Sequence, residues 1–122
     1  MDPLVDASSA AIALSERLLA IASPQRMRII AELVRQELHV SELARRVGMS
    51  RALLYMHLRK LEVAGFVSGR LELGEDGKAI KVYTVVPFAL AIDPQAIAEV
   101  VAARDESETP QWATFRGPSP RC

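Results

Sequence analysis

The chain has 122 residues, a formal net charge of zero, one cysteine and few aromatic residues, and half of its residues are hydrophobic. This length suits one modest domain with an aliphatic core, and a lone cysteine excludes both a disulfide framework within the chain and a zinc site built on several thiolates. No apolar stretch is long enough to span a bilayer and no signal-peptide pattern opens the chain, so we expect a cytoplasmic protein without membrane attachment.

The zero net charge conceals an uneven distribution of charge along the chain. Residues 24–86 carry eleven lysines and arginines against seven acidic residues, whereas the segments before and after them are both acidic. A local basic excess is what contact with nucleic acid requires, whatever the charge of the whole chain. A nucleic-acid interface is therefore expected in the central segment.

Two helices are predicted in the first third of the chain, after a short arm over residues 1–7. The apolar spacing from Ser8 or Ser9 to Ala22 is typical of a helix with a wide apolar face, which a partner subunit or the protein's own core must cover. Ser23-Pro24 then has the cap and first-turn proline of a helix start. The apolar residues expected on one face of this second helix are Met27, Ile30, Leu33 and Val34.

Two further helices are predicted between residues 41 and 65, after an extended link over residues 38–40. Ser41 is expected to cap a short helix that ends at Gly48, where a turn requires a positive φ. Ser50 is expected to cap a longer helix that ends at Gly65. The pair resembles a helix-turn-helix in its spacing. The residues expected to pack between its helices are Leu43, Ala44, Val47, Leu53, Leu58 and Leu61.

The apolar period changes from that of a helix to that of a strand after Gly65. Two alternating segments flank the turn sequence GEDGK, which predicts a β-hairpin over residues 66–86. Asp93-Pro94 starts a last amphipathic helix that runs to residue 104. Residues 105–122 are polar and proline-rich and are expected to form a disordered tail, in which Trp112, Phe115 and Cys122 have no evident partner.

The N-terminal part of the helix after Ser50 is placed where it can enter a DNA major groove. Arg51 can form a bidentate contact with a guanine edge, and Ala52 or Met56 can touch a thymine methyl. The Tyr55 hydroxyl suits a phosphate or a base, and Ser50 with the backbone N–H groups of the helix start suits a phosphate. These five residues form the predicted N-terminal end of the interface, where Ser50 holds a phosphate beside the residues that contact bases.

Other basic residues are expected to position the DNA backbone rather than to read sequence. Three of them, His57, Arg59 and Lys60, follow on the same helix. The hairpin adds Arg70, Lys78 and Lys81, and a cation at a hairpin tip can reach an adjacent minor groove. The alternative interpretation of these charges is a solvated helix face that only packs; the two serine caps, the turn glycine and the hairpin favour nucleic-acid binding.

The segments ASPQRMRIIAEL (22–33), SELARRVGMSRALLYMHLRKLEVAGFV (41–67) and the hairpin to Tyr83 resemble the ArsR/SmtB group of winged-helix repressors. The likeness covers residues 16–100, and its pattern overlaps with other winged-helix groups. It implies a mainly α fold of the α+β class, with about five helices and a two-stranded β-hairpin wing, over residues 8–104. It also implies a sequence-specific regulator, a repressor, that acts as a homodimer on a pseudo-palindromic operator in double-stranded DNA.

The resemblance gives the two apolar end helices a role, because in this group the first and last helices pair across a two-fold axis. The residues expected at such an interface are Ile12, Leu14, Leu18, Leu19, Ile97, Val100 and Val101. An effector, which the sequence does not identify, then shifts such dimers between tighter and looser DNA-binding states.

Known metal sensors of the group carry a cysteine pair near residues 38–41 or Asp and His pairs on the last helix. In this chain residues 38–41 are Leu38-His39-Val40-Ser41, without cysteine, and the last helix has no histidine. No metal or other cofactor is therefore expected. His39, beside Glu37 and Glu42, is the single candidate ligand, and a metal-responsive member with a site free of cysteine is one alternative. His57 stands where the group has a structural or phosphate-contacting histidine.

Two other classes of function are weighed against a DNA-binding regulator. A winged helix can serve protein–protein contact, with the basic face as solvated surface and the tail as the working part. An enzyme is not supported, because the sequence offers no nucleophile–histidine–acid set and no clustered carboxylate pair. The GEDGK turn lacks the preceding strand and following helix of a phosphate-binding loop.

Overall fold

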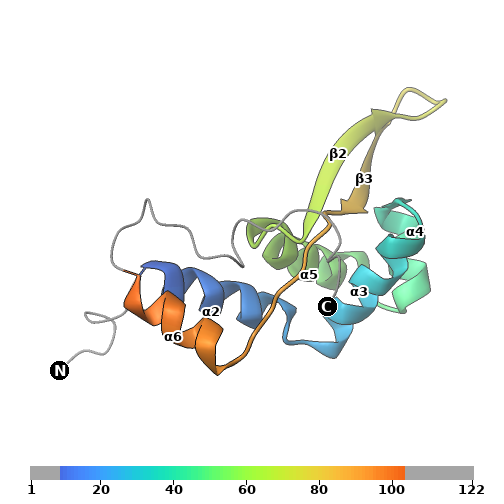
Figure 1. Cartoon of the computed structure of the whole chain (residues 1–122). Coiled ribbons are helices and arrows are strands. Elements are labelled where there is room, and N and C mark those ends of the chain that lie inside the picture. Colours follow the sequence, from blue (N-terminus) through green and yellow to red (C-terminus); the bar gives the residue numbers. More distant parts are fainter. Residues whose placement is uncertain (1–8, 104–122) are drawn as a thin grey trace. The chain divides into compact units, whose positions relative to one another are not determined.

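The structure is a computed structural model that describes residues 9–103. Its helices are α2 (Ser9–Ile21), α3 (Pro24–Arg35), α4 (Val40–Val47), α5 (Arg51–Val63) and α6 (Pro94–Ala102), and its strands are β1 (Leu38–His39), β2 (Val67–Leu73) and β3 (Ala79–Val85) (Figure 1). The predicted N-terminal arm and C-terminal tail, with Trp112, Phe115 and Cys122, lie outside the described residues. The expected α+β fold with five helices and a hairpin is confirmed over the described part.

The chain divides into two compact units. Residues 19–86 form the first, which holds α3, α4, α5 and the three strands, and Figure 1 shows its hairpin extending from the helices. Among the described residues, 9–18 and 87–103 form the second, which contains most of α2 and all of α6.

An aliphatic core joins the helices and the sheet of the first unit. Its side chains come from every element of the unit, and Phe66, between α5 and β2, is its one fully buried aromatic ring among the described residues. The buried residues of the helices and of the link to the sheet are Ile29, Leu33, Leu38, Val40, Leu43, Ala44, Val47, Leu54, Leu58, Leu61 and Phe66. Burial of this apolar surface is the main favourable contribution to the stability of such a unit.

The buried stripes of α3 and α5 differ from those expected. In α5 Leu54 is fully buried while Leu53 is 39% exposed, and in α3 Ile29 is fully buried while Met27 and Val34 are exposed. The expected packing of Leu53 between the helices is therefore wrong, and the apolar face expected for α3 is only partly buried. Both helices carry apolar residues on more than one side, so the periodicity alone left the buried face ambiguous.

Side-chain caps begin three of the helices at the expected residues. Ser23, Ser50 and Asp93 each accept a hydrogen bond from the backbone N–H three residues later, at 3.3, 3.1 and 2.7 Å. The start of α4 differs from expectation, because Val40 is its first residue and His39 is its cap, with Nδ1 accepting from the N–H of Glu42 at 3.3 Å. Ser41 therefore lies inside the helix and does not cap it.

The sheet has three strands in the order β1-β3-β2, all antiparallel. The hairpin of β2 and β3, called the wing below, is the one predicted, and β1 adds a third strand because Leu38 and His39 pair with Tyr83 and Val82. The two strands expected for the wing are thus part of a sheet of three strands. This pairing ties the link between α3 and α4 to the base of the wing.

The second unit offers exposed apolar surface. Leu14 of α2 and Val100 of α6 are buried, at 4% and 2% exposure. Four of the remaining residues predicted for a dimer interface belong to this unit and are exposed: Ile12, Leu18, Ile97 and Val101. Leu19, also exposed, falls in the first unit.

Candidate nucleic-acid interface

The helix-turn-helix is formed by α4, a turn at Gly48 and α5. Gly48 has a φ of 70°, in the left-handed region where a Cβ is unfavourable, and its N–H donates to the carbonyl of Ala44 at 2.9 Å. Ala44 is buried where the helices meet. Arg51 Nη1 donates to the Ser41 hydroxyl at 2.9 Å and so links the first turns of the two helices.

One side of α5 is open to solvent and carries the predicted contact residues. The exposed members of this set are Ser50, Arg51, Ala52, Tyr55, Met56, Arg59 and Lys60. They lie opposite the buried stripe of Leu54, Leu58 and Leu61. The helix therefore packs by one face and presents two cations beyond its first turn, together with an aromatic hydroxyl and a thioether, on the other.

His57 differs from its neighbours because it is half-buried and already engaged. Its Nδ1 accepts a hydrogen bond from Arg26 Nε at 3.0 Å, and Arg26 Nη1 donates to the carbonyl of Ala20 at 3.0 Å. Burial lowers the pKa of His57, and the nearby charges of Arg26 and Lys60 lower it further. The imidazole is therefore held neutral as an acceptor that joins α5 to α3.

Ion pairs within the protein engage several arginines of the basic segment. Arg45 and Arg46 bind Glu42, which lowers the pKa of that carboxyl to about 2, and Arg46 also lies 3.6 Å from Glu32. Arg28 Nη2 donates to the carbonyl of Arg46 at 3.0 Å. The positive charge that remains for a partner is thus smaller than the residue count suggests.

The three wing cations have different surroundings. Arg70 on β2 is paired with Glu37 and Glu72, and hydrogen bonds to these two carboxylates raise its pKa. Lys78 lies in the turn at the tip, where its backbone N–H donates to the Asp76 carboxylate at 3.0 Å. The Lys81 ammonium lies over the Tyr83 ring, 5.8 Å from its centroid.

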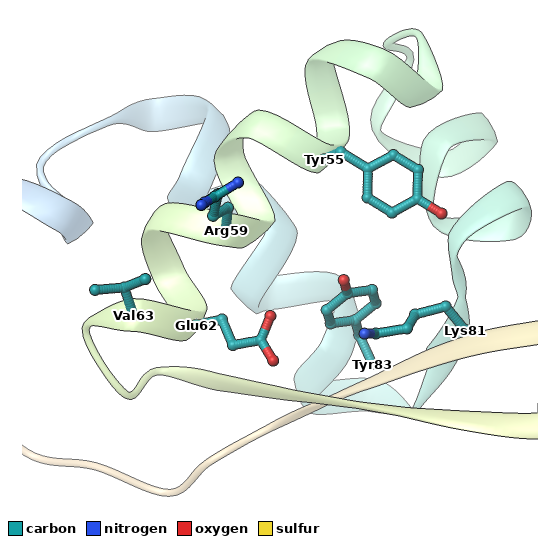
Figure 2. Close-up of a pocket in the computed structure, with 6 residues that line it drawn as sticks. All are labelled: Tyr55, Arg59, Glu62, Val63, Lys81 and Tyr83. Atoms are coloured by element: carbon teal, nitrogen blue, oxygen red, sulfur yellow. The ribbon is translucent and has the colours of Figure 1, made fainter.

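An open depression with a volume of about 500 Å³ lies between α5 and β3 (Figure 2). Tyr55, Arg59 and Lys81 were expected at the interface and line this depression. Its other lining residues, Glu62, Val63 and Tyr83, are not among the contact residues predicted from the sequence. The alternation of β3 could have indicated Tyr83, because residues 81 and 83 of a strand share one face.

The described residues show neither a metal cluster nor a membrane span. Nowhere in residues 9–103 do three or more His, Cys, Asp or Glu side chains gather as metal ligands would, and the Nδ1 of His39 is engaged in capping α4. No helix in the same range is long and apolar enough to cross a bilayer.

A helix-turn-helix followed by a β-hairpin defines the class of winged helix-turn-helix proteins. The family described as bacterial regulatory protein, arsR family, matches residues 23–68. An uncharacterized HTH-type transcriptional regulator of Methanocaldococcus jannaschii, MJ0229, is 36% identical over 81 residues, which cover 66% of this chain and 84% of that protein. The chain belongs to the ArsR family of transcriptional regulators, and such proteins are not enzymes.

Solved structures share this fold. The crystal structure of NolR from Sinorhizobium fredii matches with a TM-score of 0.56 and 26% identity, covering 83% of this chain and 87% of that one. The homodimeric winged helix-turn-helix domain Mb0332 of Mycobacterium bovis matches with a TM-score of 0.53 and 22% identity, covering 74% and 72%. The second likeness concerns the fold alone.

Proposed function

We propose that this regulator is a repressor that binds a pseudo-palindromic operator as a homodimer in the cytoplasm. The observation that supports DNA binding most directly is the solvent-facing side of α5, which carries Arg59, Lys60 and Tyr55 and begins at an exposed, capped N-terminus. A helix of this kind in a helix-turn-helix enters the major groove by its first turns. We therefore take α5 as the recognition helix.

The first two turns of α5 are proposed to read the bases. Arg51 is held by Ser41 through one Nη atom, which leaves its remaining N–H groups for a guanine edge. Ala52 and Met56 are exposed apolar groups that suit thymine methyls, and Tyr55 and Ser50 suit a base or phosphate beside them. The bond to Ser41 pre-orients Arg51, which lowers the entropy lost when it binds.

The remaining cations are proposed to hold phosphates. Arg59, Lys60, Lys78 and Lys81 form no ion pair with another described residue and are the main candidates. Arg70 contributes less, because an arginine paired with two carboxylates must lose those contacts to bind a phosphate. His57 serves the interface by positioning α5 through its bond with Arg26, rather than by contacting DNA as a cation.

Dimerisation is proposed to use α2 and α6. The exposed apolar residues of these helices within the second unit, Ile12, Leu18, Ile97 and Val101, form the contact surface, and the buried Leu14 and Val100 support it from within. Leu19 of α2, which is also exposed, is proposed as a further contact. Solvent-facing isoleucine, leucine and valine side chains gathered on the end helices are typical of a surface that a partner covers. A symmetric dimer presents two recognition helices to the two half-sites of an operator.

Salt titration of binding to random-sequence DNA tests the proposal against a protein–protein interaction module. A DNA-binding regulator binds measurably at low salt and loses affinity steeply as the salt concentration rises, because its cations displace condensed counterions. No detectable binding at low salt would contradict the proposal and favour the alternative module.

Substitution of Arg51 tests the placement of the recognition helix. Arg51→Ala is expected to weaken binding to the selected operator by about 1–3 kcal/mol and to relax the preference at one base position. Lys60→Ala, the matched control, is expected to weaken binding to all sequences alike. Competition binding against a library of operator variants measures both effects, and an unchanged preference in the Arg51 variant would show that α5 lies elsewhere on the DNA.

A further inference from the structure

The depression between α5 and the wing has a composition suited to an anion. Tyr55, Arg59, Glu62 and Val63 face it from successive turns of α5, and Lys81 and Tyr83 face it from β3. It thus holds two cations, two phenol groups and one carboxylate. Figure 2 shows the two tyrosines and Lys81 on one side of the depression and Arg59 and Glu62 on the other.

A glycine in the partner strand allows this arrangement of Lys81 and Tyr83. Gly69 of β2 pairs with Tyr83, so the two residues share one face of the sheet. A Cβ at Gly69 would lie 2.7 Å from Lys81 Cε and 2.8 Å from Tyr83 Cε1, which is too close for either contact. The missing side chain therefore lets the tyrosine ring and the lysine stem lie across β2.

Tyr83 places a hydrogen-bond donor on the floor of the depression. Its side chain is only 4% exposed, and its hydroxyl points toward α5 (Figure 2). Burial raises the pKa of this phenol, and the nearby Glu62 and Tyr55 raise it further, so the group keeps its proton near neutral pH. The hydroxyl makes no hydrogen bond to another residue in the part of the chain that the structure describes.

The tip of the wing is a poorer place for an anion than this base. Glu75 and Asp76 outnumber Lys78 there, and Arg70, the single cation of β2, is already paired with two carboxylates. The depression, by contrast, is lined by two cations, Arg59 and Lys81, and by a single carboxylate, Glu62. The local charge therefore favours an anion at the base of the wing over one at its tip.

We propose that the depression binds one backbone phosphate of DNA, with the Tyr83 hydroxyl as donor and Arg59 and Lys81 as the flanking cations. The inference rests on the proposed function and makes it more specific. A phosphate held from both α5 and β3 fixes the wing relative to the recognition helix, so that phosphate sets the register in which the helix meets the bases.

The hydroxyl of Tyr83 is tested by Tyr83→Phe, which removes one oxygen atom and keeps the ring. Equilibrium binding to the selected operator is expected to weaken by about ten- to a hundredfold, the usual range for one hydrogen bond to a charged group. The salt dependence stays unchanged, because no charge is lost. Thr84→Val removes a hydroxyl from the opposite face of the same strand and is expected to bind as the wild type does.

Two charge variants test the electrostatics of the same site. Glu62→Gln removes the carboxylate that repels a phosphate, and it is expected to tighten binding to all sequences by about threefold at low salt. Lys81→Gln is expected to weaken binding to all sequences and to reduce the salt slope by about one ion. Unchanged affinity in both variants would overturn the proposed site.

A set of operator duplexes, each with one neutral methylphosphonate in place of a phosphate, locates the contact. On the duplex that lacks the contacted phosphate charge, Tyr83→Phe and Arg59→Gln are both expected to bind as tightly as the wild type does. This duplex is expected to be the same one for both variants. Losses that persist at every position, or that vanish at different positions, would overturn the single shared phosphate. If the wild type binds DNA and the Tyr83→Phe variant binds equally well, this inference alone is overturned. If the wild type does not bind DNA, the proposed function is overturned as well.

Discussion

At the scale of single residues, His57 makes stability depend on pH. Its lowered pKa means that the unfolded chain takes up a proton more readily than the folded protein does. The contribution of the neutral imidazole is therefore fully present above its ordinary pKa of 6.5 and is lost as the pH falls through the lowered value. Protonated Nδ1 can no longer accept from Arg26, so the link between α3 and α5 is lost as well.

We expect the free energy of unfolding in urea to fall as the pH is lowered from above 6.5, the ordinary pKa of the imidazole, through the lowered pKa of His57. His57→Asn offers an oxygen near the position of Nδ1 and does not titrate, so its stability should change less over this range. His39→Asn is the matched control and should retain the decline. A wild-type profile that rises toward acid would contradict this role of His57.

The sequence predicted correctly which residues are exposed where their polarity decides it, and it failed where polarity does not distinguish the residues. The solvent-facing residues of α5 are largely charged or polar, and all but the half-buried His57 are exposed as expected. Leu53 and Leu54 are chemically identical neighbours, and only the packing of α5 on its surroundings buries Leu54. The role of Tyr83 depends on the missing side chain of Gly69 in another strand, which no local pattern reveals.

At the scale of elements, the turn between α4 and α5 depends on the backbone of one residue. Gly48 has a φ of 70°, and a Cβ at this position would meet no atom within 4 Å, so a side chain there costs backbone strain alone. Gly48→Ala is expected to lower the free energy of unfolding by about 1–2 kcal/mol. Gly48→Asn should cost less, because asparagine tolerates the left-handed region.

Urea unfolding of the two Gly48 variants measures this difference. Equal losses for alanine and asparagine would show that the turn does not keep its left-handed conformation in solution. The same turn sets the angle between α4 and α5, so operator affinity should decline in the same order as stability.

Element boundaries followed from caps, and the exception has a tertiary cause. Ser23, Ser50 and Asp93 begin helices as their sequences predict, because a cap acts on N–H groups only three residues away. Ser41 is an equally suitable cap, yet α4 starts earlier. Pairing of β1 with β3 holds Leu38 and His39 extended, which lets His39 cap the helix ahead of the expected start.

At the scale of the whole molecule, the fold and family could be predicted from the sequence. The amount of positive charge that internal ion pairs leave for a DNA partner could not. The basic excess of the central segment is divided between ion pairs inside the protein, such as those of Arg46 and Arg70, and the cations of α5 and β3. Pairing of this kind depends on side chains brought together from distant segments, as with Glu37 and Arg70. Charge counts along a chain therefore overestimate the electrostatic attraction to DNA.

The proposed homodimer is tested on α6, where Val101 is 59% exposed. Val101→Glu places an unpaired carboxylate in an apolar contact, and desolvation of that charge is expected to weaken the dimer at least about tenfold. Val34→Glu is the matched control, because Val34 of α3 is 65% exposed and lies outside the proposed contact. Sedimentation velocity over a range of concentrations should show a dimer for the wild type and the control and a shift toward monomer for Val101→Glu.

Operator binding then connects assembly to function. A dimer contacts two half-sites at once, so the Val101→Glu variant should bind the full operator only about as tightly as it binds an isolated half-site. The wild type should lose affinity sharply when the spacing between half-sites is changed by half a helical turn, since its two recognition helices then face different sides of the duplex. A monomeric wild type, or a Val101→Glu variant that stays dimeric and binds normally, would exclude α6 from the interface.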